Sequence, residues 1–335
     1  MSLSPSTTEP STPTGSTATV VKSSRLRGSA QQLLALGGLL MVWIYFAVAK
    51  GSTFIPWANQ KNILFSTVVV GLLAVGTTIV IVAGGIDLSI GTGMTLCAVM
   101  SGVFIVDIGM PTFIGIPMAV LFGGLIGLVN GSLVSYLGFP PFIATLAMMQ
   151  VAQGLSLVIS DAAPIYFESD YSTISTAEWI PGLPNAIVVF ALASVVAGVV
   201  LAKTVLGRFA YSIGSNEAAT ALSGINVKRW NVLIYAYAGL FTGLAGVMIS
   251  ARLGSAQPAV GLGYELQAIA AVIIGGTSLS GGKGTIAGTV IGAILISTLN
   301  NGLQLMSIPQ QWQLVILGLV ILLAVFADNL RTRRT

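Results

Sequence analysis

Histidine is absent from this chain of 335 residues, and cysteine occurs once, as Cys97. A single cysteine cannot form a disulfide within the chain, and without histidine neither a histidine-based metal site nor a histidine acid/base pair can form. Charge is also scarce, because Asp, Glu, Lys and Arg make up 7% of the residues, whereas soluble domains carry roughly 25%. An intramembrane enzyme would need a nucleophile with a base, or a metal cluster, and no such set is visible.

Hydrophobic residues dominate instead, at 55% of the chain, and the mean hydropathy is +0.93. This composition indicates an all-α polytopic membrane protein built from helices of about 20 residues each. We predict ten apolar spans, at residues 33–49, 63–83, 89–106, 113–133, 142–159, 185–202, 230–250, 266–279, 285–305 and 312–327. The eighth run is short and rich in glycine. Ten spans place both ends of the chain on the same side of the membrane.

The regions outside the spans define the remaining organisation. Residues 1–28 are rich in Ser, Thr and Pro with few apolar groups, which predicts a disordered cytoplasmic tail. Residues 29–328 are expected to form a single transmembrane domain, followed by a short basic cytoplasmic tail at 329–335. The first apolar run lacks a small-residue cleavage site, so we interpret it as a retained span rather than a signal peptide.

The distribution of Lys and Arg predicts the orientation of these spans. With a cytoplasmic N-terminus, only Lys50, Lys61 and Arg252 of the 14 basic residues fall outside, as the positive-inside rule favours. Both termini and the connection 203–229 are then cytoplasmic, and the longest outer connection is 160–184. Aromatic residues of this outer connection either pack within the loop and at the membrane interface or form a docking surface for an extracytoplasmic partner. They are Tyr166, Phe167, Tyr171 and Trp179.

The connection 203–229 contains a polar segment, GSNEAATALSGI at 214–225. Ser215 or Asn216 can cap a helix, Glu217 lies in its first turn, where the helix dipole favours an acid, and Gly224 is suited to end it. We therefore predict about two helical turns on the cytoplasmic face. They form either an ordinary interfacial helix or a surface for a cytoplasmic partner.

A glycine-rich segment precedes Lys283, but it is not a phosphate-binding loop. The pattern requires Gly where Thr277 stands and Ser or Thr where Gly284 stands. LSGGK at 279–283 also resembles the signature peptide of ATP-hydrolysing ABC subunits. We interpret this likeness as a coincidence, because those subunits are soluble and carry a phosphate loop. The chain is thus expected to hydrolyse no ATP and to bind no cofactor or metal itself.

Two glycine-rich decapeptides, 84–93 and 275–284, agree at six of ten positions. Since the chain holds 40 glycines, the agreement is either chance or the mark of an internal repeat, parallel or inverted. In the second case the glycines would interrupt helices beside a substrate path and act as hinges. The hinge candidates are Gly84, Gly85, Gly275, Gly276, Gly281 and Gly282.

Polar side chains inside or beside the apolar runs are the candidates for a substrate path. Asp87 lies between two runs, a costly position for an acid, so it caps the third span, lies in an aqueous turn or contacts substrate. The neutral residues could replace the hydration of a neutral polyhydroxylated solute, or hydrogen-bond between helices. The scarcity of buried charges argues against an ionic solute. The candidates are Asp87, Ser89, Asn130, Thr145, Gln150, Asn300 and Asn301.

Several of these segments together resemble a known family. EAA at 217–219, followed by Gly224, resembles the EAA loop of permease subunits in bacterial binding-protein-dependent ABC importers. From about 62 to 328 the chain resembles the ribose-type sugar permeases. The matching segments are GGIDLS (84–89), NG (130–131), PPFIATL (140–146), LGR (206–208), SGI (223–225), ARLGSA (251–256), LGYEL (262–266), GGTSL (275–279) and GGKG (281–284). The loop departs from the general pattern, because four residues instead of three separate Ala219 from Gly224 and the trailing Ile-x-Leu-Pro is missing.

The resemblance implies a permease subunit of the bacterial cytoplasmic (inner) membrane that imports a monosaccharide, a pentose or a hexose, by alternating access. The implied partners are cytoplasmic ABC ATPase subunits that bind ATP and Mg, an extracytoplasmic sugar-binding protein, and a second permease chain, identical or paralogous; no nucleic acid is expected. The residues that it assigns to ATPase coupling are Arg208, Glu217, Ala218, Ala219, Ser223, Gly224 and Ile225. The alternative is an ion-coupled secondary transporter of a small neutral polar solute, which the scarcity of intramembrane carboxylates disfavours.

Overall fold

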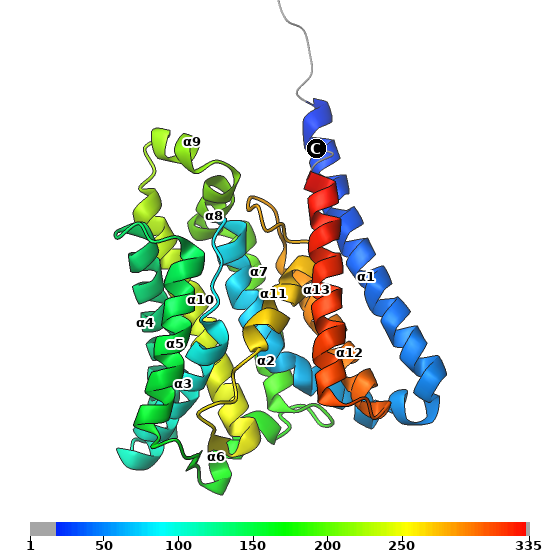
Figure 1. Ribbon diagram of the computed structural model, residues 1–335, viewed down its shortest axis with the longest axis vertical. Helices are drawn as coiled ribbons and strands as arrows, with labels where there is room; N and C mark the ends of the chain where they lie inside the picture. Colours follow the sequence, from blue (N-terminus) through cyan, green and yellow to red (C-terminus); the bar gives the residue numbers. More distant parts are fainter. Residues whose placement is uncertain (1–17, 333–335) are drawn as a thin grey trace, which may run out of the picture.

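The computed structural model describes residues 18–332, with side chains for residues 32–326, as a bundle of apolar helices (Figure 1). The helices and strands in chain order are α1 (Ala18–Phe54), α2 (Trp57–Val82), α3 (Ile90–Gly102), the π-helical turn η1 (Val103–Asp107), α4 (Thr112–Ser135), α5 (Pro141–Ile159), β1 (Ile165–Tyr166), α6 (Ser169–Thr176), α7 (Asn185–Lys203), α8 (Val205–Ser215), α9 (Glu217–Leu222), α10 (Val227–Leu253), β2 (Ser255–Ala256), α11 (Tyr264–Ile274), α12 (Ile286–Leu305) and α13 (Gln310–Thr332). The predicted all-α polytopic class is confirmed.

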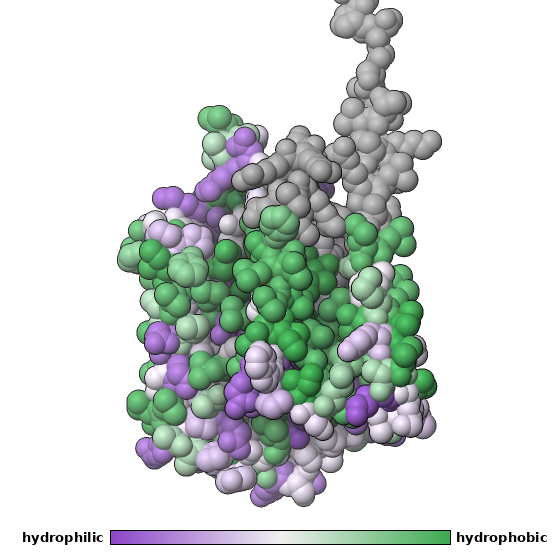
Figure 2. Space-filling view, turned by 45° about the vertical axis from the view of Figure 1, so that its right-hand side comes forward, coloured by the Kyte–Doolittle hydropathy of each residue, from purple (hydrophilic) through white to green (hydrophobic). Residues whose placement is uncertain are grey.

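Eight helices of the described part are long and apolar enough to cross a membrane: α1, α2, α3 with η1, α4, α5, α7, α10 and α12. A broad hydrophobic patch covers the middle of one face, and hydrophilic residues gather near the lower end (Figure 2). We call the two ends of the bundle the α9 end, at the top of Figure 1, and the α6 end, at its bottom.

The eighth predicted span, 266–279, is wrong as a complete crossing. α11 runs from Tyr264 to Ile274, 11 residues. At 1.5 Å per residue it is about 16 Å long, roughly half of the hydrocarbon thickness. The turn at Gly275 and Gly276 ends it, and Gly276 adopts φ = +90°, which helical residues do not. α11 is therefore a short helix that begins inside the bundle.

The first and last helices extend into the segments that were predicted to be tails. α1 begins at Ala18, so residues 18–28 are helical rather than part of a disordered tail. Extending an existing helix adds one hydrogen bond for each residue fixed, without the cost of a new nucleus. Residues 1–17 of the predicted tail lie outside the described residues. At the other end, α13 continues to Thr332 through most of the predicted basic tail, of which residues 333–335 also lie outside.

α2 forms the centre of the bundle. In its most apolar window 89% of the residues are buried, against 11% for α1 at the periphery. It packs against α7, α10, α11 and α12, and the fully buried side chains of Leu72, Leu73, Ile79 and Ile81 belong to the main hydrophobic core. α2 has no charged residue after Lys61. A helix that is apolar on all sides is expected at the centre of a bundle, and this feature can be read from the sequence.

Glycines let α4 and α10 approach each other closely. Gly123, Gly127 and Gly131 follow one face of α4 at spacings of four. A Cβ at Gly123 or Gly127 would clash with the backbone of α10, at Gly239 and Tyr235 respectively. Small residues at this spacing are a common way for membrane helices to associate, because dispersion forces grow as the backbones approach.

Figure 1 shows that the helices divide into two halves of opposite direction. From the α9 end, α1 runs down, α2 up, α3 down, α4 up and α5 down; α7 runs up, α10 down, α11 up, α12 down and α13 up. The packing agrees with this division. If α2 corresponds to α10 and α4 to α12, the contact of α4 with α10 corresponds to the contact of α12 with α2. These directions and contacts have the pattern of an inverted repeat, in which α1–α5 correspond to α7 and α10–α13.

The two glycine-rich decapeptides are not the equivalent parts of this repeat. The segment 84–93 precedes and opens α3, whereas 275–284 follows α11, the counterpart of α3. The glycines with left-handed backbone are Gly84, at φ = +85° in one segment, and Gly276, Gly281 and Gly282, at +72° to +90° in the other, and they stand at different positions when the two segments are aligned. The likeness of the two sequences therefore does not extend to their backbone conformations.

Candidate functional sites

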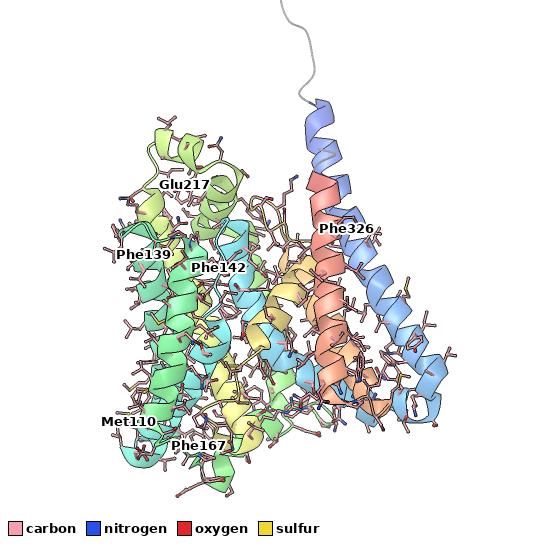
Figure 3. All side chains as sticks on the ribbon, in the orientation of Figure 1. Met110, Phe139, Phe142, Phe167, Glu217 and Phe326 are labelled. Atoms are coloured by element: carbon pink, nitrogen blue, oxygen red, sulfur yellow. The ribbon has the colours of Figure 1, made fainter. Side chains whose placement is uncertain are left out.

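The polar segment of the connection 203–229 forms an exposed helix at the α9 end. α9 has six residues, and its cap is Asn216, whose Oδ1 accepts a hydrogen bond from Ala219 N at 2.9 Å. Gly224 follows at φ = +82°, a conformation that favours glycine. Of the two capping candidates, Asn216 therefore makes the contact. Figure 3 shows Glu217 at this end, far from Phe167 at the α6 end.

The predicted coupling residues surround α9. Glu217, Ala218, Ala219, Ser223 and Gly224 are exposed, and Leu222 has 90% of its surface accessible, so the helix offers an apolar tip. Arg208 is exposed on α8 and Ile225 is half-buried. The role of α9 in coupling stays a prediction.

Next to α8, the backbones of Gly84, Gly214 and Gly281 lie in close contact. The sequence did not reveal this contact. Gly214 lies near the end of α8, and a Cβ there would clash with Val82 O and lie 2.6 Å from Gly282 N. A Cβ at Gly281 would lie 3.0 Å from Gly214 Cα and 3.1 Å from Gly84 Cα. The two glycine-rich connections thus meet under α8, and Gly282 N donates a hydrogen bond to Val82 O at 2.8 Å.

Four of the predicted path residues form one buried network around the start of α3. Asp87 Oδ1 accepts hydrogen bonds from Ser89 N at 2.9 Å and Ser89 Oγ at 2.6 Å. Asn130 of α4 donates from Nδ2 to Ser89 Oγ at 2.8 Å, and Thr145 of α5 donates to Ile86 O at 3.2 Å. These contacts hold the segment 83–89 in place. The N-cap residue of α3 is Ser89, and the Asp87 carboxylate lies two residues before it without a hydrogen bond to the first turn of the helix.

The starts of α3 and α11 meet inside the bundle. A Cβ at Gly91 would clash with Glu265 Oε2, and a Cβ at Gly261 would clash with Gly91 O. Glu265 is 8% exposed, and both of its carboxylate oxygens lie 3.1 Å from Gly263 N, which donates to them. Each helix start thus carries one carboxylate that accepts backbone N–H groups, Asp87 for α3 and Glu265 for α11.

A hollow of about 910 Å³ with a mixed polar and apolar lining lies between α2, α10, α11, α12 and α13. It contains the predicted path residues Asn300 and Asn301. Asn300 Nδ2 donates to Gln267 Oε1 at 3.2 Å, and Asn301 and Asn59 exchange two hydrogen bonds of 3.0 Å. Gln304, another polar residue of the ninth predicted span, also lines it. The polar lining residues that the sequence did not single out are Ser66, Arg252, Tyr264, Gln267, Ser297, Gln310 and Gln313. Their amide and hydroxyl types were the available signal.

The predicted path residues are therefore not one site. The network at Asp87 and the pocket at Asn300 belong to different helices, and Gln150 lies apart from both, exposed on α5. Among the described side chains, residues 32–326, no three His, Cys, Asp or Glu lie close enough to hold a metal ion.

The outer connection is tied to the segment that leads into α11. Strand β1 pairs antiparallel with β2, with Ile165 opposite Ala256, and Phe167 N donates to Gly254 O at 3.1 Å. Two of the four aromatic residues pack within the loop, and the other two have the exposure that either the membrane interface or a docking surface would require. Phe167 stacks on the buried Tyr171 with ring centroids 3.8 Å apart, whereas Tyr166 and Trp179 are exposed.

A single ion pair of the described residues joins this loop to α2. Lys61 Nζ lies 3.2 Å from Glu178 Oε1. The N–H of Gly182, which donates to Glu178 Oε2 at 2.7 Å, and then the Lys61 ammonium hold the pKa of the Glu178 carboxyl below its usual value.

Comparison with known proteins finds a family and relatives that align with most of this chain. The family model described as branched-chain amino acid transport system / permease component matches residues 59–325. The ribose import permease protein of Haemophilus influenzae is 43% identical over 295 residues, 87% of this chain and 91% of the relative. The D-allose transport system permease protein of Escherichia coli is 36% identical (87% of this chain, 90% of the relative), and its xylose transport system permease protein is 30% identical (91% and 93%). No solved structure matches the chain. A family match over this length, joined to relatives of this similarity, shows that the chain belongs to the transport-system permease components and, among them, to the ribose-type ABC sugar permeases.

Proposed function

We propose that this chain is the membrane subunit of an ABC importer that moves a monosaccharide, a pentose or a hexose of the ribose type, across the bacterial inner membrane. The observation that carries the proposal is the 43% identity to a ribose import permease over 87% of the chain. Separate cytoplasmic ATPase subunits, an extracytoplasmic sugar-binding protein and a second permease chain complete the transporter. The permease itself makes and breaks no covalent bond.

The positions of α8 and α9 support a path by which movement of the ATPase is passed to the membrane helices. α9 is exposed and capped at both ends, and α8 connects it to Gly214, where the two glycine-rich connections meet. An ATPase that pulls or tilts α9 would move α8 against Val82 and Gly282, at the ends of α2 and of the connection before α12. In this mechanism of alternating access, the motion reaches both halves of the inverted repeat at one contact.

The experiment that tests the function is uptake of radiolabelled D-ribose, D-allose and D-xylose in cells that lack their own transporters for these sugars. The cells express the permease with its ATPase and binding protein. We expect uptake of at least one sugar that stops when ATP is depleted and continues when an ionophore collapses the ion gradients. Uptake that follows the gradient while ATP remains would instead establish the ion-coupled secondary transporter.

A further inference from the structure

A tyrosine of α8 is hydrogen-bonded to the connection that leads into α12. Tyr211 is half-buried in the middle of α8 (Val205–Ser215), and its hydroxyl donates to Gly284 O at 2.7 Å. In Figure 1 this connection, drawn in orange between α11 and α12, reaches the α9 end beside α8. The two residues are 73 positions apart, so no local pattern in the sequence indicated the bond.

Gly284 lies where a displacement passes into α12. It directly precedes Thr285, the N-cap residue of α12, whose Oγ1 accepts a hydrogen bond from Gly288 N at 3.2 Å. The turn before Gly284 is closed by its own backbone bond, because Ser278 N donates to Lys283 O at 3.1 Å. A movement of Gly284 O therefore carries this closed turn and the start of α12 with it.

The contact between Gly214 and Val82, by contrast, transmits force in one direction. A Cβ at Gly214 would clash with Val82 O, so the two backbones touch, but no hydrogen bond joins these two described residues. Touching atoms resist compression strongly, whereas their attraction is weak, and a gap of about 1 Å already removes up to about half of it. This contact can pass on a push from α8 but not a pull.

A hydrogen bond resists separation as well as compression, because its energy falls when the donor and the acceptor move apart. The bond from Tyr211 is thus the contact of α8 that suits a pull on the connection 275–284. The same connection is bonded onward to α2, since Gly282 N donates to Val82 O at 2.8 Å.

We propose that Tyr211 is a positioning residue for coupling: its hydroxyl makes the connection 275–284 and the start of α12 follow α8 when the ATPase draws α9 away from the membrane. The contact at Gly214 acts in the opposite stroke, when α9 is pushed towards the membrane. This inference rests on the proposed function and names the side chain that passes the return movement to the membrane helices.

The first test removes the hydroxyl and keeps the ring. In Tyr211→Phe, α8 keeps its anchor on α10, where Phe209 packs edge to face on Trp230 with ring centroids 4.6 Å apart. Tyr237→Phe is the matched control, because Tyr237 is also half-buried and its hydroxyl has no hydrogen-bond partner among the described residues.

The measurement is the amount of sugar moved per ATP hydrolysed in proteoliposomes that contain the permease, its ATPase and its binding protein. Tyr211→Phe should lower this ratio about fivefold, equal to about 1 kcal/mol for the loss of one hydrogen bond, and Tyr237→Phe should not. Equal ratios in the two variants overturn the proposal.

The second test follows the movement itself and does not depend on transport. Hydrogen exchange is measured on the purified complex with and without ATP and vanadate, which hold the ATPase closed. In the wild type and in Tyr237→Phe, closure should change the protection of both α8 and 275–284; in Tyr211→Phe it should change that of α8 alone. An equal response of 275–284 in Tyr211→Phe and the wild type refutes the link, and so does a wild type in which either segment fails to respond.

The two levels of the argument fail in different ways. A wild-type transporter that takes up none of the sugars in an ATP-dependent manner contradicts the proposed function. A wild-type transporter that works normally, with Tyr211→Phe behaving as Tyr237→Phe in both measurements, contradicts the role of Tyr211 alone.

Discussion

We predict that the N-cap hydrogen bond of α9 determines how well ATP hydrolysis is coupled to sugar transport. α9 has six residues, and isolated helices shorter than about 12–15 residues are marginal in water. Its order therefore depends on its ends, chiefly on Asn216 Oδ1, which accepts from Ala219 N at 2.9 Å. In Asn216→Ala this bond is lost, at a cost of about 1 kcal/mol.

That cost has a direct consequence for docking. About 1 kcal/mol corresponds to about a fivefold fall in the ratio of ordered to frayed α9. If the ATPase grips ordered α9, the amount of sugar moved per ATP hydrolysed should fall by a similar factor. Asn216→Ser and Asn216→Asp keep a side-chain acceptor at the cap, so both should retain coupling near that of the wild type.

The chain supplies a matched control. Asn226 caps α10 in the same way, with Oδ1 accepting from Arg229 N at 3.0 Å. α10 has 27 residues packed into the bundle, so Asn226→Ala should fray at most its first turn. The assay is sugar transport and ATP hydrolysis in proteoliposomes with the ATPase and binding protein. Equal coupling in Asn216→Ala and Asn226→Ala would refute the reasoning.

Three further perturbations test the contacts around this element and the packing below it. Gly214→Ala places a Cβ against Val82 O and Gly282 N, so we expect a loss of about 1–3 kcal/mol and of uptake, measured against Gly198→Ala, where the Cβ is free. Gly127→Val pushes α4 away from Tyr235 of α10 and should lower the melting temperature of the detergent-solubilised chain, whereas Gly154→Val, on an open face of α5, should not. The pKa of Glu178 is lowered in the folded state, so the loop gains stability above the usual carboxyl pKa and loses it as the pH falls through the lowered value. The protection factors of the amides in 160–184, which correct for the intrinsic pH dependence of exchange, should therefore fall in acid. Glu178→Gln should remove this pH dependence, and an unchanged profile in that variant would contradict the assignment.

Two carboxylates lie near the starts of α3 and α11, in segments that share little sequence. Asp87 precedes α3 in GGIDLS, and Glu265 lies in the first turn of α11 in LGYEL. Each accepts hydrogen bonds from backbone N–H groups, which compensates the acid inside an apolar bundle. The same geometry weakens the case for an ion-coupled mechanism, because both carboxylates already have local partners.

The sequence by itself determined the elements whose cause is local. Apolar runs specify spans because each helix satisfies its own backbone in a bilayer, and Asn216, Glu217 and Gly224 specify α9 because capping acts within one turn. The family resemblance of ordered short segments added the functional class. Tertiary structure decided everything that joins distant residues. Asn59 meets Asn301 across 242 positions, Gly214 meets Gly84 and Gly281, and α11 starts inside the bundle. The amides around the hollow lie together only because α11, α12 and α13 fold against α2 and α10, and no local period in the sequence encodes that packing.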